Sequence, residues 1–182
     1  MKVSDADILI VPGLGGSGPD HWQSRWQSKL PNARRIELAD WDAPDPSAWA
    51  RAIEAAAAVG ERPIVLVSHS LGSVASAMAA PALAGRNVRG AFLVTPPSAE
   101  RLAGAGFAGP TTWWPRAPLP FASIVVASRD DPWAAFADSE KLAAQWGSTL
   151  ADAGACGHLN AESGHGPWPE GLIRFAGFLR AL

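Results

Sequence analysis

Ile64-Val65-Leu66-Val67-Ser68-His69-Ser70-Leu71-Gly72 is the stretch that decides the fold of this chain. Four apolar β-forming residues lead into a sharp turn with Ser70 at its apex, and small helix-forming residues follow. Such a turn lifts the serine hydroxyl above the edge of a sheet and points a helix N-terminus at developing negative charge. The usual pattern is Gly-x-Ser-x-Gly, and Ser68 stands in place of the first glycine. Because that change is small, Ser70 remains a candidate nucleophile.

On both sides of this turn in the sequence, short apolar runs typical of strands alternate with segments whose apolar residues recur at helical spacing. Helix starts are indicated by Asp20 as an N-cap and by Asp45 with Pro46. Strands alternating with helices favour right-handed βαβ units, so we predict an α/β protein with about six strands in a mostly parallel, doubly wound sheet. At 182 residues the chain is expected to form one domain. The expected strands are 8–11, 34–38, 64–67, 88–94, 123–127 and a weaker 149–153, and the expected helices are 20–30, 46–59, 71–84, 134–146 and 170–182.

Composition limits the classes of partner. A net charge of −2 provides no basic surface for nucleic acid or for an anionic membrane. The single cysteine, Cys156, cannot form an internal disulfide, and no long apolar segment or secretory signal is apparent. We therefore expect a cytoplasmic protein that acts on a small molecule.

A general base and an acid are needed to activate a serine, and both are expected later in the chain than this turn, the nucleophile elbow 68–72. The acid should follow a late strand, where Asp131 is favoured over the adjacent Asp130 because of its Asp-Pro step. The base should follow the last strand, where His158 is favoured over His165 because Gly157 precedes it and permits a sharp loop.

Two backbone N–H groups are needed to stabilise an oxyanion. One is expected from Leu71, directly after Ser70, and the other from Leu14 in the glycine-rich loop 12–18 that follows the first strand. The same loop spells G-x-G-x-x-G, which is also a dinucleotide-binding pattern. The next helix begins only after Pro19-Asp20, so we prefer the oxyanion interpretation and expect no cofactor. The four scattered histidines form no metal-binding pattern.

One segment, residues 96–120, interrupts the alternation of strands and helices. It is rich in proline and glycine and carries Trp113 and Trp114. We interpret it as a short cap loop over the sheet edge, the alternative being a surface excursion whose tryptophans fill the core. The residues expected near the substrate are His21, Trp22, Trp113, Trp114 and Trp133.

These motifs together resemble the small serine hydrolases of the retinoblastoma-binding-protein-nine and YdeN type, a branch of the α/β-hydrolases. The resemblance rests on the loop 11–16, the elbow 68–72, the acid loop 130–132 and the segment 157–169. It implies a compact α/β-hydrolase fold and a triad of Ser70, Asp131 and His158. The pattern Leu-x-Cys-x-Glu is absent around Cys156, so binding to the retinoblastoma pocket is not expected.

Two functions remain open from the sequence. The first is a metal-independent serine hydrolase that cleaves small esters or related acyl substrates through an acyl-enzyme, in the manner of a carboxylesterase. The second is a protein of the same fold that has lost turnover and acts as a binding or scaffolding module. The complete set of Ser70, Asp131 and His158 favours the first.

Overall fold

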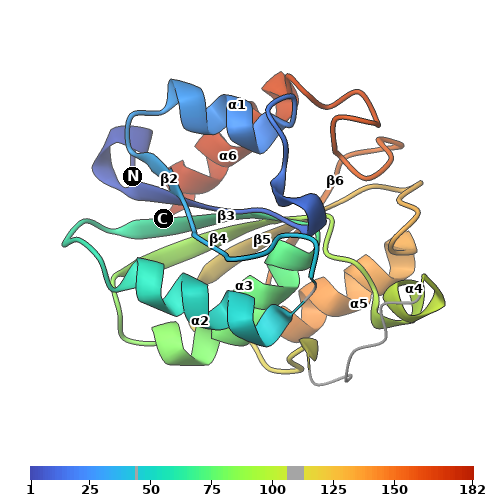
Figure 1. The fold of residues 1–182 in the computed structure, drawn as a ribbon, viewed down its shortest axis with the longest axis horizontal. Coiled ribbons are helices and arrows are strands. Elements are labelled where there is room, and N and C mark those ends of the chain that lie inside the picture. Colours follow the sequence, from blue (N-terminus) through green and yellow to red (C-terminus); the bar gives the residue numbers. More distant parts are fainter. Residues whose placement is uncertain (44, 106–112) are drawn as a thin grey trace.

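The computed structural model describes residues 1–43, 45–105 and 113–182. Six strands form a single sheet in the order β2-β1-β3-β4-β5-β6, and every pair of neighbours is parallel (Figure 1). The expected α/β fold is thereby confirmed. The strands are β1 (Asp7–Val11), β2 (Ala33–Arg35), β3 (Ile64–His69), β4 (Val88–Val94), β5 (Ala122–Ala127) and β6 (Thr149–Asp152).

Helices cover both faces of the sheet, with α1 and α6 on one side and α2, α3 and α5 on the other (Figure 1). Within the described residues, no helix is long and apolar enough to cross a membrane. The helices are α1 (Trp22–Lys29), α2 (Pro46–Ala57), α3 (Leu71–Leu83), α4 (Ala99–Gly104), α5 (Phe136–Trp146) and α6 (Pro169–Ala181), with short 3₁₀ turns η1 (Val3–Asp5) and η2 (Leu14–Gly16).

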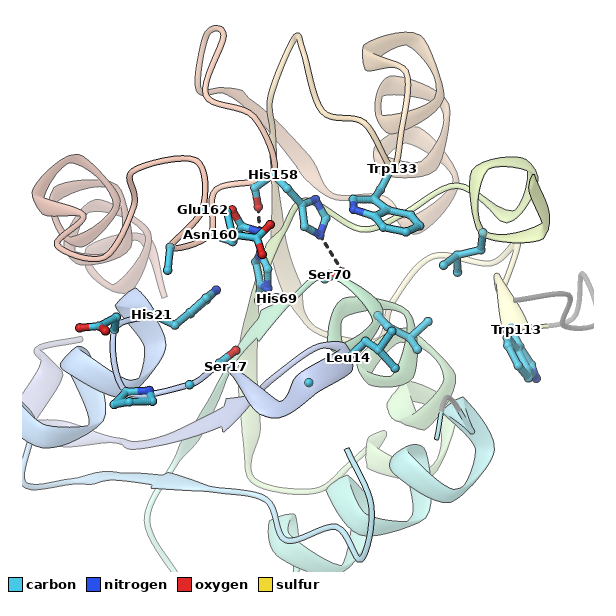
Figure 2. Close-up of a pocket in the computed structure, with 17 residues that line it drawn as sticks. Leu14, Ser17, His21, His69, Ser70, Trp113, Trp133, His158, Asn160 and Glu162 are labelled. Carbon is cyan, nitrogen blue, oxygen red and sulfur yellow. Dashed lines mark hydrogen bonds between the residues drawn. The ribbon is translucent and has the colours of Figure 1, made fainter. Parts of the chain in front are cut away.

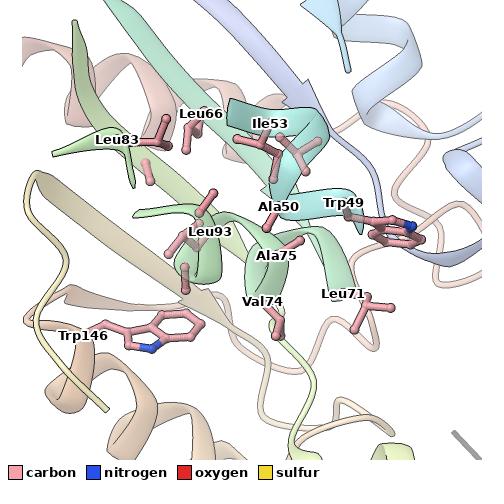
Figure 3. Packing of buried hydrophobic residues seen from close by; sticks show 14 of the residues in the cluster. Trp49, Ala50, Ile53, Leu66, Leu71, Val74, Ala75, Leu83, Leu93 and Trp146 are labelled. Carbon is pink, nitrogen blue, oxygen red and sulfur yellow. The ribbon is translucent and has the colours of Figure 1, made fainter. Parts of the chain in front are cut away.

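Two cores lie on opposite faces of the sheet. Trp22 and Trp26 of α1 and Phe175 of α6 belong to the core on one face. Trp49 of α2 and Trp146 of α5 pack on the other face, around the small residues of α3 (Figure 3). Burial on both faces explains why β3 begins with the continuous apolar run 64–67.

Two local expectations are wrong. The second strand is shorter and begins one residue earlier than 34–38. It is an edge strand, and its pairing with β1 covers Ala33 to Arg35 and ends there. Asp20 does not cap α1. Its carboxylate pairs with Arg25 at 2.9 Å, and His21 is the N-cap, its Nδ1 accepting from the backbone N–H of Gln23. By contrast, Asp45 caps α2 as expected.

The segment 96–120 contains a helix that was not expected, α4, which begins at Ser98 as N-cap. Residues 106–112 of the anticipated cap lie outside the described residues. The described parts on either side bring Leu102 and Trp113 to the pocket discussed below.

Candidate active site

Ser70 occupies a strained turn between β3 and α3. Its backbone has φ 54° and ψ −128°, a region that side-chain-bearing residues rarely adopt. Two glycines let the neighbouring loop approach this turn. A Cβ at Gly13 would lie 2.7 Å from Ser70 Cβ, and one at Gly72 would lie 2.2 Å from the carbonyl oxygen of Pro12. The turn is thus pressed against the carboxyl end of β1.

Ser68, which replaces the usual first glycine, is accommodated by a hydrogen bond. Its side chain is fully buried, and its Oγ lies 2.7 Å from Oγ of Ser76 in α3. A buried hydroxyl needs such a partner. The replacement therefore ties the strand before the turn to the helix after it.

A chain of hydrogen bonds joins Ser70 to two distant segments. His158 Nε2 lies 2.9 Å from Ser70 Oγ, and His158 Nδ1 lies 2.9 Å from Asp131 Oδ1 (Figure 2). His158 and Asp131 are both buried. The same Asp131 oxygen accepts from the backbone N–H of Trp133, which fixes the carboxylate. The histidine can thus accept a proton from Ser70 while the carboxylate orients its ring.

The competing residues are used elsewhere. Asp130 Oδ1 accepts from Ser128 Oγ at 2.8 Å and from the backbone N–H of Gly157 at 2.7 Å. These donors, Gly157 first, lower the pKa of Asp130. His165 contacts the hydroxyl of Ser163. The two adjacent aspartates therefore differ in role, since Asp130 holds the loop before His158 and Asp131 contacts its ring.

The loop that carries His158 is bent and pinned. Gly157 and Leu159, on either side, both have positive φ, at 56° and 47°. The carbonyl oxygen of His158 lies 2.9 Å from His69 Nε2 and accepts from Thr95 Oγ1 at 3.3 Å. These contacts from β3 and from the end of β4 set the position of the imidazole.

Leu14 and Leu71 are the first residues of η2 and α3. A helix leaves the N–H groups of its first turn without intrahelical partners. Both residues line the same pocket as Ser70. Both residues thus lie at the site, and the assignment of their N–H groups as oxyanion donors stays a prediction.

The chain is similar to known proteins over nearly its whole length. A model of the serine hydrolase family matches residues 8–177. The chain belongs to this family. It is 34% identical to a YdeN-like hydrolase of Pectobacterium atrosepticum, with a TM-score of 0.84 over 97% of this chain and 92% of that one. The resemblance to the YdeN group is thus confirmed.

More distant structures share the fold. The ydeN gene product of B. subtilis is 20% identical, with a TM-score of 0.76 over 96% of this chain and 99% of that one. Esterase 2 of Thermogutta terrifontis is 18% identical, with a TM-score of 0.66 over 100% and 85%. None of the curated proteins that were compared matches the chain.

The hydrolase has a pocket of about 470 Å³ around Ser70. Figure 2 shows two unlike sides, with Trp133 and Trp113 on one side of Ser70 and polar residues on the other. The apolar wall also includes Leu102. The polar side is formed by Ser17, Asp20, His21, His69, Asn160 and Glu162.

Two of the five residues expected near the substrate do not line this pocket. Trp22, the first residue of α1, is fully buried, and its Nε1 donates to the carbonyl of Leu159. Trp114 donates to the carbonyl of Pro97 and fills the core beside α5. In both residues the indole N–H donates to a backbone carbonyl, and the ring is directed into the core, away from the pocket. His21, Trp113 and Trp133 do line the pocket.

Sequence reasoning missed Leu102, Asn160 and Glu162. The last two follow His158 by two and four residues, so proximity to the base was the available signal. Leu102 lies on the unexpected helix α4 and offered none. Among residues 1–43, 45–105 and 113–182, no group of three or more His, Cys, Asp or Glu side chains is arranged to hold a metal ion.

Three imidazoles stand in a row at the site. The ring centroids of His21 and His69 are 4.6 Å apart, and those of His69 and His158 are 4.9 Å apart. Burial lowers the pKa of His21 to about 4, with smaller contributions from Arg35 and His158. Burial likewise holds the pKa of His69 well below its usual value. Both are neutral at physiological pH, so neither adds a charge beside His158.

Proposed function

We propose that the hydrolase is a carboxylesterase-type enzyme that cleaves small esters through an acyl-enzyme on Ser70. The observation that carries the proposal is the hydrogen-bonded chain from Ser70 Oγ through His158 to Asp131, with 2.9 Å at each link. In this assignment Ser70 is the nucleophile, His158 the general base and Asp131 the residue that orients it.

In the first half-reaction, Ser70 Oγ forms a bond to the carbonyl carbon while its proton passes to His158 Nε2. The carbonyl electron pair moves to oxygen, and the N–H groups of Leu14 and Leu71 stabilise that oxyanion. When the pair returns, the bond to the alkoxide breaks and His158 gives the leaving oxygen its proton. Water then repeats the sequence on the acyl-Ser70 ester and frees the acid.

The pocket supports short acyl groups. Its volume of about 470 Å³ lies toward the low end of small-ligand sites, and Trp133 and Leu102 provide an apolar wall. We expect turnover of p-nitrophenyl esters to peak at short chains and to fall toward dodecanoate. A maximum at the longest chains would contradict this substrate class.

The central test uses a fluorophosphonate probe and p-nitrophenyl acetate. The wild-type protein should be labelled and should release p-nitrophenolate, whereas Ser70→Ala should do neither. The matched control is Ser4→Ala, since Ser4 is exposed at the N-terminal turn and should leave both readouts unchanged. If Ser70→Ala is labelled as well as wild type, the assignment is wrong. If the folded wild type shows neither reaction, the alternative of a binding module is favoured.

A further inference from the structure

Gln23 is a fully buried amide in the first turn of α1, and the proposed chemistry makes no use of it. Its Nε2 donates to the carbonyl of Val11 at 3.1 Å and to that of Val67 at 3.0 Å. Its Oε1 accepts from Ser17 Oγ at 2.7 Å. A buried amide is costly unless its polar atoms are paired, and this one has partners at both ends.

Along the chain, the partners of Gln23 lie on both sides of the first expected oxyanion donor and ahead of the second. Val11 is the last residue of β1, three residues before Leu14, and Ser17 lies three residues after Leu14. Val67 lies in β3, four residues before Leu71. One side chain thus contacts the segment on each side of the first donor and the strand that leads to the second.

We propose that Gln23 is a positioning residue that holds the N–H groups of Leu14 and Leu71 at the separation that an oxyanion requires. The proposal rests on the function proposed above. Beyond the ends of β1 and β3, the glycine-rich loop and the turn leave the sheet. Gln23 joins the last residue of β1 and Val67 of β3 to Ser17 of that loop through side-chain hydrogen bonds.

A second group supports the loop from outside. The guanidinium of Arg35 donates to the carbonyls of Gly16 and Ser17 and to Ser24 Oγ. Ser24 Oγ in turn donates to the carbonyl of Ser17 at 2.6 Å. Ser17 has φ 52°, so the loop is bent at the residue that Gln23 and Arg35 both hold. The loop is therefore fixed from two sides, and Gln23 alone also reaches β3.

The test compares wild type with Gln23→Met, which keeps the approximate volume and removes all three side-chain hydrogen bonds. A donor displaced by about 1 Å costs on the order of 100-fold in turnover. We expect kcat for p-nitrophenyl acetate to fall by about that factor with KM unchanged, because the oxyanion forms only in the transition state. Affinity for a trifluoromethyl ketone, whose adduct on Ser70 carries the same oxyanion, should fall in parallel. The pH midpoint of kcat/KM should not move, since the contact between His158 and Asp131 is untouched.

The structural control is Ser123→Ala. Ser123 lies near the start of β5, and its Oγ lies 2.6 Å from Oγ of Ser148. This variant should lower the thermal midpoint without changing kcat or ketone affinity in the folded protein. If folded Gln23→Met likewise keeps the wild-type kcat and ketone affinity, the positioning role is wrong.

If Gln23→Met does not fold, Ser17→Ala replaces it, since this change removes only the hydroxyl that donates to Gln23. We expect a smaller loss of kcat, about tenfold, again with unchanged KM. Wild-type kcat in Ser17→Ala would overturn the proposal. A wild-type protein without esterase activity or fluorophosphonate labelling would instead overturn the proposed function. Active wild type, inactive Ser70→Ala and fully active Gln23→Met would refute the role of Gln23 alone.

Discussion

Trp22 Nε1 donates a 2.8 Å hydrogen bond to the carbonyl of Leu159, the residue directly after His158. Leu159 has φ 47°, which is unfavourable for a side-chain-bearing residue. The indole projects from α1 and packs against Trp26 and Trp168. Trp22 therefore supports the bent loop that carries His158. It does not line the pocket, so we expect no contact between Trp22 and the substrate.

Replacing Trp22 with Phe should impair the base loop. The variant leaves the Leu159 carbonyl without its donor, so the strained loop and the imidazole gain freedom. We expect kcat/KM for p-nitrophenyl acetate to fall by about tenfold and the thermal midpoint to drop. Steady-state kinetics and a thermal melt measure the two effects.

The matched control for that variant is Trp49→Phe. Trp49 is equally buried but belongs to the core on the other face of the sheet. The Trp49→Phe variant should have a lower thermal midpoint and an unchanged kcat/KM. Equal kinetic losses in the two variants would show that Trp22 contributes only packing.

Adjacent aspartates provide a sharper test of role. Asp131→Asn should lower kcat by about a thousandfold or more, because an amide cannot both orient the ring and stabilise the imidazolium. Asp130→Asn should affect kcat far less, since Asp130 contacts Gly157 and Ser128 and not the His158 ring. Both variants are measured with the same ester, and the reverse order of losses would exchange the two assignments.

Some of this site could be read from the sequence. The run 64–72 predicted the turn, and the chain order predicted the loops of the acid and the base, because parallel strands end at one edge and bring their following loops together. Within those loops, the Asp-Pro step favoured Asp131 and the preceding glycine favoured His158. The direction of the tryptophans could not be predicted. Trp22, Trp114 and Trp133 stand in similar loop or helix-start contexts, and only the position of distant carbonyls decides which indole turns inward.

Gln23 shows a second limit of sequence reasoning. A glutamine in the first turn of a helix is expected to be solvated, since glutamine is mostly exposed in proteins. Its burial depends on Val67, 44 residues away, and that contact exists only once β1, β3 and α1 are assembled. The N-cap of α1 differs from the expected one for a related reason. Asp20 is a good capping residue, but Arg25 binds its carboxylate.

The irregular turn residue can be tested by restoring the usual glycine. Ser68→Gly removes the partner of Ser76 Oγ, which is buried in α3, and adds backbone freedom in the unfolded chain. We expect a loss of about 1–2 kcal/mol in the free energy of unfolding, measured in urea. The activity of the folded variant should be unchanged. A more stable Ser68→Gly would show that the hydroxyl pair contributes nothing.

We expect the free energy of unfolding to fall already in mildly acidic solution, because of two buried histidines. Burial lowers the pKa of His21 to about 4 and that of His69 well below normal, so the unfolded chain binds protons that the native state does not. Stability is therefore complete above the unfolded pKa of about 6.5 and is lost as pH falls toward the folded values. For His21 alone the loss at about pH 5 is on the order of 2 kcal/mol.

Urea unfolding at about pH 8 and about pH 5 measures this loss. Asp130 and Asp152 do not contribute to the loss at about pH 5. Their pKa values are lowered in the folded protein, so the stability that they provide is lost only as the pH falls below the ordinary aspartate pKa of 3.8. The informative variant is His21→Asn, whose side-chain oxygen can still accept from the Gln23 N–H but does not titrate. It should lose clearly less stability than wild type between the two conditions, with His69 responsible for the remainder. Equal losses in the two proteins would mean that His21 is not held neutral by the fold.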